Sequence, residues 1–234
     1  MNLLALDTAT DACSVALLAN GHIYQQVEIA PRRHADLILG FLDAVLAEAG
    51  LVTSQLDAIA VGIGPGSFMG VRTAVAVAQG LAFAADLPVI PVSTLQTLAQ
   101  TAYQTSSAAQ VLAGWDGRMQ AIYWGAYQLQ AGIMQPVIPD QLTVPAEIQP
   151  PILAGNLAWV CAGNAWSIYR DALPVTVSSL TEQLTTLYPS AAAMIHIAAK
   201  RYADQDNLLA AEALQPLYLR NQVAQLPLAA REGG

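Results

Sequence analysis

Charged residues are scarce in this chain of 234 residues, since Asp, Glu, Lys and Arg together make up only 11% of it. Basic residues are rarer than acidic ones: the chain has nine Lys and Arg and seventeen Asp and Glu, which gives a net charge of −8. The nine are scattered, with no run that could neutralise several phosphates together. We therefore do not expect this chain to capture nucleic acid by itself.

The sequence also contains few cysteines and no long apolar run. Cys13 and Cys161 are the only cysteines, and both lie in apolar stretches outside any paired-cysteine motif. This pattern predicts buried thiols and a cytoplasmic protein. A membrane span needs about twenty consecutive apolar residues, whereas the apolar stretch 73–85 is short and bounded by charges. The residues before Asp7 lack the basic start and the cleavage site of a signal peptide, so we expect no signal peptide and no contact with a membrane.

Apolar residues, in contrast, make up 55% of the sequence, more than a monomer of this size normally buries. Two predicted helices carry the excess. On the helix over 33–49, one apolar arc, which includes Leu39, should pack on its own sheet, and Leu37, Phe41 and Ala44 form a second arc beside it. In the helix over 71–85 only Arg72, Thr73 and Gln79 are polar, and the other residues predict a helix that is buried all round. The alternative is a thick monomer core with helices on both sides of a sheet.

We expect these two helices to dock on another chain, because their combined apolar surface exceeds what monomers usually expose. The predicted partner-binding residues are His34, Leu37, Ile38, Phe41, Ala44, Val71, Arg72, Val75, Ala78, Gln79 and Ala82.

A repeated pattern of elements predicts two similar α/β halves, 1–106 and 107–234. Leu3–Asp7, a polar turn and two further strands separated by Asn20-Gly21 are echoed from Leu112 to Ile138. The first half continues with a helix, a buried strand at 58–61, a glycine-rich turn, the helix over 71–85 and a helix opened by Ser93. In the second half we expect a helix from Ser190 to Asp204 and a C-terminal segment that packs back on the first half.

Two turns contain candidate functional residues. Asp7, Thr8 and Thr10 follow the first strand, where a carboxylate and hydroxyls can hold a metal-bound water or approach a phosphate, or can simply close the turn. Gly64, Gly66 and Ser67 belong to a loop that opens a helix, so the loop can offer N–H groups to an anion or act as a tight structural turn. The three histidines are too far apart for a helical metal motif, and we expect no metal site.

Several segments together resemble the bacterial TsaB (YeaZ) family. They are LLALDTATDACSVAL at 3–17, GIGPGSFMGVR at 62–72, AQGLA at 78–82, PVSTL at 91–95, GRMQAIYWGAY at 117–127 and PLYLRNQVA at 216–224. The resemblance implies an actin-like ATPase (ASKHA) fold, made of two related RNase H-like halves, each a mixed sheet with helices. It also implies a non-catalytic partner in the synthesis of threonylcarbamoyladenosine on tRNAs that read codons starting with A.

The partners implied by the resemblance are a TsaD-like catalytic paralogue and a TsaE-like ATPase, with ATP or ADP and a metal on those subunits and no cofactor on this chain alone. Transfer RNA would be met only through the complex, and the chain alone would form a homodimer. An alternative from the residues is a small-molecule kinase or nucleotidase that uses Asp7 and the loop over 64–70. A peptidase is a third alternative, which the spacing of the histidines disfavours.

Overall fold

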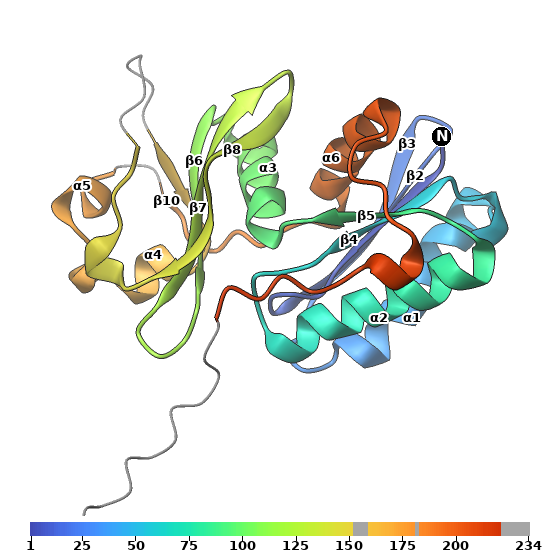
Figure 1. The fold of residues 1–234 in the computed structure, drawn as a ribbon, viewed down its shortest axis with the longest axis horizontal. Coiled ribbons are helices and arrows are strands. Elements are labelled where there is room, and N and C mark those ends of the chain that lie inside the picture. The colour runs from blue at the N-terminus through green and yellow to red at the C-terminus, as the bar shows by residue number, and fades with distance from the viewer. Residues whose placement is uncertain (152–158, 181–182, 221–234) are drawn as a thin grey trace, which may run out of the picture.

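The computed structural model describes residues 1–151, 159–180 and 183–220. These residues form two five-stranded sheets that lie one after the other along the longest axis of the molecule (Figure 1). The last four residues of the resemblance motif at 216–224, and the end of the second predicted half, lie outside the described residues.

The first sheet comes entirely from the first hundred residues. Its strands are β1 (Leu3–Asp7), β2 (Ala12–Ala19), β3 (His22–Ile29), β4 (Ala58–Gly62) and β5 (Val89–Val92), in the order β3-β2-β1-β4-β5. Asn20 and Gly21 have φ of 51° and 78°, the left-handed pair that a two-residue hairpin turn requires. The Asn-Gly hairpin predicted from the sequence is therefore confirmed.

The second sheet repeats this arrangement. Its strands are β6 (Gln110–Asp116), β7 (Ile122–Gln130), β8 (Ile133–Thr143), β9 (Val160–Ala162) and β10 (Gln183–Leu184), in the order β10-β9-β6-β7-β8. Read from β8, this is the order of the first sheet, and β6, like β1, is antiparallel to the next strand and parallel to the fourth. Asp7 and Asp116 therefore end equivalent strands, and the two-half α/β fold is confirmed.

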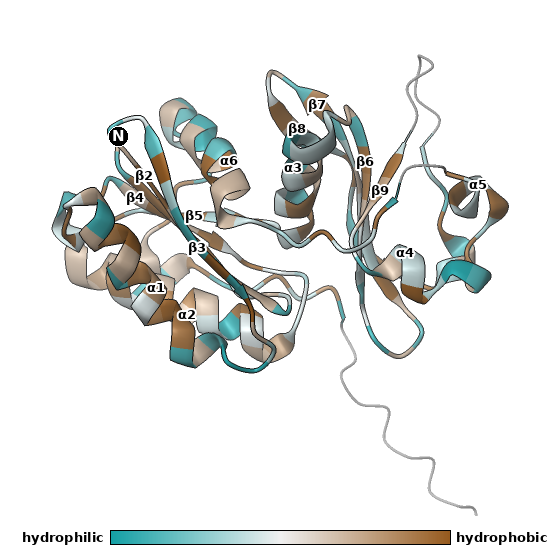
Figure 2. Cartoon of the chain, turned by 180° about the vertical axis from the view of Figure 1, so that it is seen from behind, coloured by the Kyte–Doolittle hydropathy of each residue, from teal (hydrophilic) through white to brown (hydrophobic). Residues whose placement is uncertain are grey.

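The helices are α1 (His34–Ala49), α2 (Phe68–Ala85), α3 (Thr94–Ser106), α4 (Ala165–Ile168), α5 (Val175–Ser178) and α6 (Ala191–Asp204). Strand alternation decides which helix covers which face of the first sheet. Leu4 and Leu6 pack in the cluster that holds α1 and α2, while Leu3 and Ala5 pack against α6. The first sheet is thus enclosed between two helical layers, as Figure 2 shows from behind.

The helices do not respect the boundary between 106 and 107. α3 comes from the first half of the sequence but packs on the second sheet, where Leu95 and Leu98 share a core with Val111. Conversely, α6 packs on the first sheet through Met194 and Ile195. Each sheet is therefore covered partly by a helix of the other half, because only the tertiary arrangement determines which uncovered sheet face an apolar helix meets.

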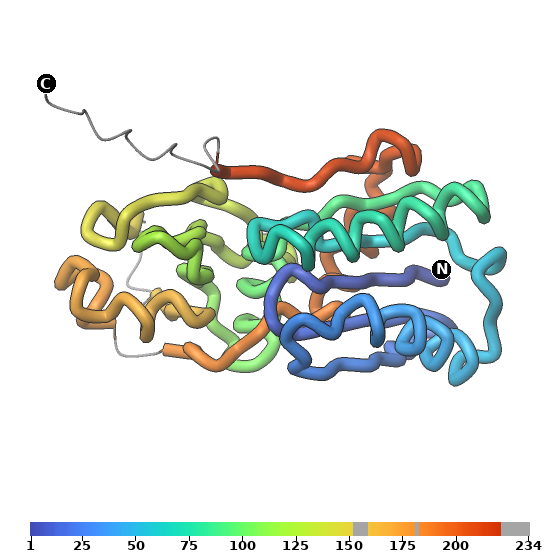
Figure 3. The backbone as a smooth tube through the Cα atoms, turned by 90° about the horizontal axis from the view of Figure 1, so that it is seen from below, coloured from blue at the N-terminus to red at the C-terminus, as the bar shows by residue number. Residues whose placement is uncertain are grey.

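The C-terminal segment 205–220 returns to the first half and passes beside α2 (Figure 3). Leu209 and Val89 exchange two backbone hydrogen bonds of 2.9 and 2.8 Å, and Leu217 N–H donates to Ile63 O at 2.8 Å. Ala211 and Leu214 are buried in the core that α1 and α2 share with the sheet. The segment therefore extends the first half from the other end of the chain.

Helix α2 begins at Phe68, three residues before the predicted start, because the Ser67 hydroxyl accepts a hydrogen bond from Gly70 N–H at 3.4 Å and caps the helix. The longer helix corrects the expectation that no segment could span a membrane. Of the helices described, α2 alone is long and apolar enough by length and composition, a test that core helices also pass. Its inner side, with Ala74 and Ala78, is buried in the first-half core.

Candidate functional site

The turn after β1 holds its polar groups in internal hydrogen bonds. Asp7 Oδ1 accepts from Ala9 N–H at 2.8 Å, and Oδ2 accepts from the Thr94 hydroxyl at 3.2 Å. Thr8 Oγ1 donates to Gly70 O at 2.7 Å, and Thr10 Oγ1 accepts from Ala12 N–H at 3.3 Å. All three predicted residues of this turn are buried. The arrangement favours the interpretation in which these side chains close the turn.

The glycine-rich loop lies directly on that turn. A Cβ added to Gly66 would lie 2.2 Å from Ala9 O, and one added to Gly70 would lie 2.0 Å from Thr8 O. Ser67 N–H donates to Ala9 O at 2.7 Å. Gly64 has a φ of 98°, which favours glycine. These glycines are explained by close backbone packing, which favours a structural role for the loop.

Burial penalises the charged form of Asp7 and raises its pKa from 3.8 to about 6, although the bonds from Ala9 and Thr94 act in the opposite direction. The folded protein holds the Asp7 proton more tightly than the unfolded chain does. The free energy of unfolding should therefore fall as the pH rises from about 4 to about 6. The loss should be on the order of 2–3 kcal/mol.

The Asp7→Asn variant tests this, because its amide can still accept from Ala9 and can donate to Thr94. Urea titrations of both proteins at pH 4 to 7 should show a difference in unfolding free energy that changes with pH through this window. Groups that titrate in both proteins cancel in the comparison. A difference that is independent of pH would contradict a buried, destabilised carboxylate.

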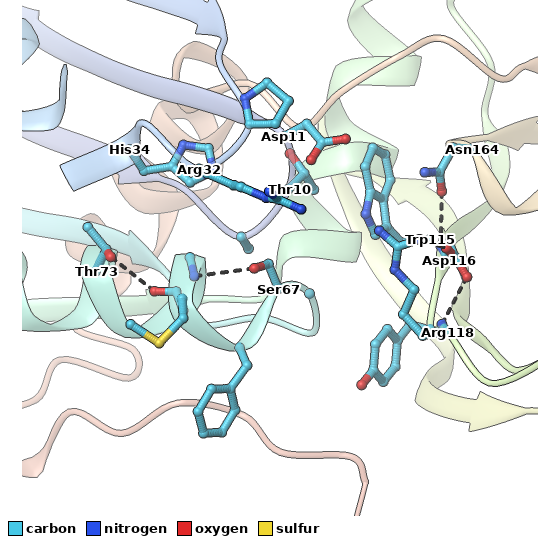
Figure 4. A pocket seen from close by; sticks show the side chains of 18 of the residues that line it. Thr10, Asp11, Arg32, His34, Ser67, Thr73, Trp115, Asp116, Arg118 and Asn164 are labelled. Atoms are coloured by element: carbon cyan, nitrogen blue, oxygen red, sulfur yellow. Dashed lines mark hydrogen bonds and ion pairs between the residues drawn. The ribbon is translucent and has the colours of Figure 1, made fainter. Parts of the chain in front are cut away.

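A cleft of about 920 Å³ lies between the two halves. The turn that follows Asp7 and the turn that follows Asp116 both contribute residues to its walls (Figure 4). Of the predicted phosphate-proximal residues, Thr10, Gly66 and Ser67 line the cleft, whereas Asp7, Thr8 and Gly64 do not. The sequence reasoning missed the residues of the other wall, which include Trp115, Asp116, Arg118 and Asn164. The repeat of the strand-Asp-turn unit is the signal that could have found Asp116.

Asp116 repeats the bonding of Asp7 in the second half. Its Oδ1 accepts from Arg118 N–H at 2.8 Å and from the Tyr169 hydroxyl at 2.7 Å. Arg118 also pairs with Asp116 at 3.0 Å. The opposite wall carries Arg32 and Asp11, so acidic and basic groups are balanced across the cleft (Figure 4).

No group of three His, Cys, Asp or Glu side chains that could hold a metal ion occurs within residues 1–151, 159–180 and 183–220. His34, predicted to meet a partner, is largely buried and lines the cleft, and its Nδ1 has no hydrogen-bond partner among the described residues. Burial lowers the pKa of this imidazole.

The outer side of α1 and α2 carries exposed and half-buried apolar residues. We define the α1–α2 surface as Leu37, Gly40, Phe41 and Ala44 of α1 together with Met69, Thr73, Ala76, Gly80 and Phe83 of α2. The five α2 residues recur every three or four positions and so share one helix face. Met69 is 67% exposed and Phe83 is 81% exposed. A Cβ at Gly40 or Gly80 would meet nothing within 4 Å, so internal packing does not require either glycine.

This surface corrects the predicted set of partner-binding residues. Leu37, Phe41 and Ala44 are half-buried at the surface. Five others are buried in the first-half core and cannot touch another chain in this conformation, namely Ile38, Val71, Val75, Ala78 and Ala82. Leu39, assigned to the inner arc, is exposed. The other residues of that arc include Ile38, Leu42, Val45 and Leu46, which are buried as predicted, so the helical wheel of α1 is wrong at Leu39 alone among these.

Arg72 and Gln79 face the C-terminal segment. The Arg72 guanidinium carbon lies 5.4 Å from the centroid of the Tyr218 ring, and Gln79 Nε2 donates to Leu214 O at 3.0 Å. The prediction that α2 is buried all round is also wrong, since Met69, Ala76, Gly80 and Phe83 are exposed.

Comparison with known proteins finds relatives whose similarity extends over almost the whole chain. A family model described as TsaD, tRNA N6-adenosine threonylcarbamoyltransferase, matches residues 20–228. The tRNA threonylcarbamoyladenosine biosynthesis protein TsaB of Escherichia coli strain K12 is 38% identical, over 99% of this chain and 100% of that protein. The TsaB protein of Haemophilus influenzae is 38% identical over 99% of each chain. The chain belongs to the TsaB (YeaZ) family.

The fold of this TsaB-family chain agrees with a solved relative. The structure of YeaZ from Pseudomonas aeruginosa superposes with a TM-score of 0.88 and 41% identity, and the match covers 93% of this chain and 99% of that one. The resemblance to the TsaB (YeaZ) family that the sequence motifs indicated is therefore confirmed. The α/β fold of the TsaD-related group is confirmed as well.

Proposed function

We propose that this TsaB-family chain is a non-catalytic scaffold and activator subunit of the complex that transfers a threonylcarbamoyl group to adenosine next to the anticodon of tRNA. The names of its relatives supply the pathway, since they are tRNA threonylcarbamoyladenosine biosynthesis proteins. The observation that carries the scaffold role is the α1–α2 surface. Its exposed Met69 and Phe83 flank Ala76 and Gly80, which leave room for a partner helix to approach closely.

In this proposal the partner on the α1–α2 surface is a TsaD-like catalytic paralogue, and a TsaE-like ATPase joins the assembly in the cytoplasm. ATP or ADP and the metal belong to those subunits, and tRNA is met only in the complex. Without the paralogue, the same surface would pair two copies of this chain. The internal bonding of Asp7 and Thr8 and the close packing of Gly66 support a chain that does not itself carry out the transfer.

Depletion of the protein in its host, followed by mass spectrometry of the nucleosides of bulk tRNA, tests the role. We expect threonylcarbamoyladenosine to fall to a small fraction of its normal level and to return on re-expression. A normal level after depletion would contradict the proposal. Calorimetry of the isolated chain with ATP and magnesium tests the kinase or nucleotidase alternative, for which tight binding and turnover would be required.

A further inference from the structure

A second cavity, of about 460 Å³, lies beside the cleft between the halves. The C-terminal segment forms one wall, the start of α2 forms another, and Tyr123 of β7 closes it from the second half. We call it the arginine pocket after Arg72 and Arg220, which line it. Gly66, Phe68 and Tyr123 line both cavities, so the two are adjacent.

The arginine pocket is locally cationic in an otherwise acidic chain. Arg220 Nη2 donates to Gly117 O at 3.0 Å and to Arg118 O at 3.3 Å, which fixes the guanidinium without neutralising it. Arg72 is held by its stack on Phe68. Within the described part of the chain, neither guanidinium has a carboxylate partner, and no residue that lines the pocket is acidic. Both charges are therefore available to an anion.

Aromatic rings stand beside these cations. Phe68 is 52% exposed and Tyr218 is 50% exposed, with ring centroids 6.2 Å apart. Arg72 Cζ lies 5.4 Å from the Tyr218 ring centroid. Exposed rings next to guanidinium groups are the features by which proteins hold unpaired nucleotides, since rings stack on bases and arginines contact phosphates. The volume also falls in the range of small-ligand pockets.

We propose that the arginine pocket receives an unpaired nucleotide of the tRNA substrate, with its phosphate on Arg72 and Arg220 and its base against Tyr218. This inference rests on the proposed function, because the tRNA is presented by the assembled complex. An acidic peptide would satisfy the two arginines but would give no role to the exposed rings. Neutralising one phosphate is too little to hold RNA by itself, which agrees with a chain that does not capture nucleic acid alone.

The double variant R72Q/R220Q tests the proposal in the complex with the catalytic paralogue. We would titrate an unmodified tRNA transcript that reads a codon starting with A, at several salt concentrations. The variant complex should bind about tenfold more weakly. The slope of log affinity against log salt should shrink by about 0.7, because the one phosphate that the two arginines neutralise on an unpaired strand is no longer neutralised. Y218A should weaken binding about tenfold at an unchanged slope, since stacking carries no charge.

The matched control is R170Q, which removes an exposed arginine of the second half far from the pocket in sequence and should leave affinity and slope unchanged. Wild-type affinity and slope in R72Q/R220Q would overturn the proposal. Loss of co-elution of R72Q/R220Q with the paralogue would assign the pocket to a protein partner and overturn it as well. Failure of the wild-type chain to co-elute would instead count against the proposed scaffold function.

Discussion

Replacing Phe83 with glutamate should abolish association with the catalytic paralogue while leaving the chain folded. Phe83 belongs to the α1–α2 surface and is 81% exposed, so the substitution removes almost no buried contact from the isolated protein. In a complex, the same side chain would be desolvated, and a carboxylate there would lack a partner. We expect a loss of about 3 kcal/mol or more, which is over a hundredfold in affinity.

The measurement is titration of the paralogue by calorimetry, with circular dichroism to confirm that the variant is folded. V175E is the matched control, because Val175 is 79% exposed but lies on α5 of the second half. It introduces the same charge outside the α1–α2 surface and should bind normally. If V175E lost binding and F83E kept it, the docking surface would lie on the second half and our assignment would be wrong.

The same substitution should separate the homodimer from the monomer. If the α1–α2 surface pairs two copies when the paralogue is absent, sedimentation should show a dimer for the wild type and a monomer for F83E. Val75 of the same helix is not a suitable site for a charge substitution, because it is buried and a charge there would unfold the chain.

The second large effect is expected at Gly70, in the first turn of α2. Replacing it with alanine would place Cβ 2.0 Å from the backbone oxygen of Thr8. Because the obstructing atom is backbone, the loop and the β1–β2 turn would have to separate, and the bond from the Thr8 hydroxyl to Gly70 O would be strained. We expect a loss of about 3 kcal/mol in unfolding free energy, at the upper end for overpacking.

Gly80 on the same helix provides the control. A Cβ there meets nothing within 4 Å, so G80A should gain up to about 1 kcal/mol from helix propensity. Urea denaturation of the two variants should therefore move the midpoint in opposite directions. Equal effects would show that helix propensity, and not contact with the β1–β2 turn, governs both positions.

Much of the local structure could be predicted because it depends on neighbours in the sequence. The Asn20-Gly21 hairpin needs only two residues with positive φ. The Ser93 cap needs only a hydroxyl that accepts from Leu95 and Gln96 N–H groups. The sequence misplaces the start of α2, because Ser67 caps the helix and the next three residues, which the glycine-rich motif assigns to a loop, already form its first turn.

The candidate site was only partly predictable. The first wall of the cleft was recognised through the glycine loop, but Arg118 and Asn164 come from segments without a motif of their own. The arginine pocket joins Arg72 to Arg220, which are far apart in the sequence, and no local pattern relates them. Cations that are scattered along the chain are thus brought together at one edge of the cleft.

The sequence by itself determined the elements, their repetition in two halves and the family, because strand alternation, turns and caps are set by nearby residues. The tertiary structure alone decided which apolar faces remain at the surface, where α3 and α6 pack, and which arginines meet. The physical reason is that burial depends on the element that covers a face. In a chain with 55% apolar residues, almost every helix face could be a core face until its neighbour is known.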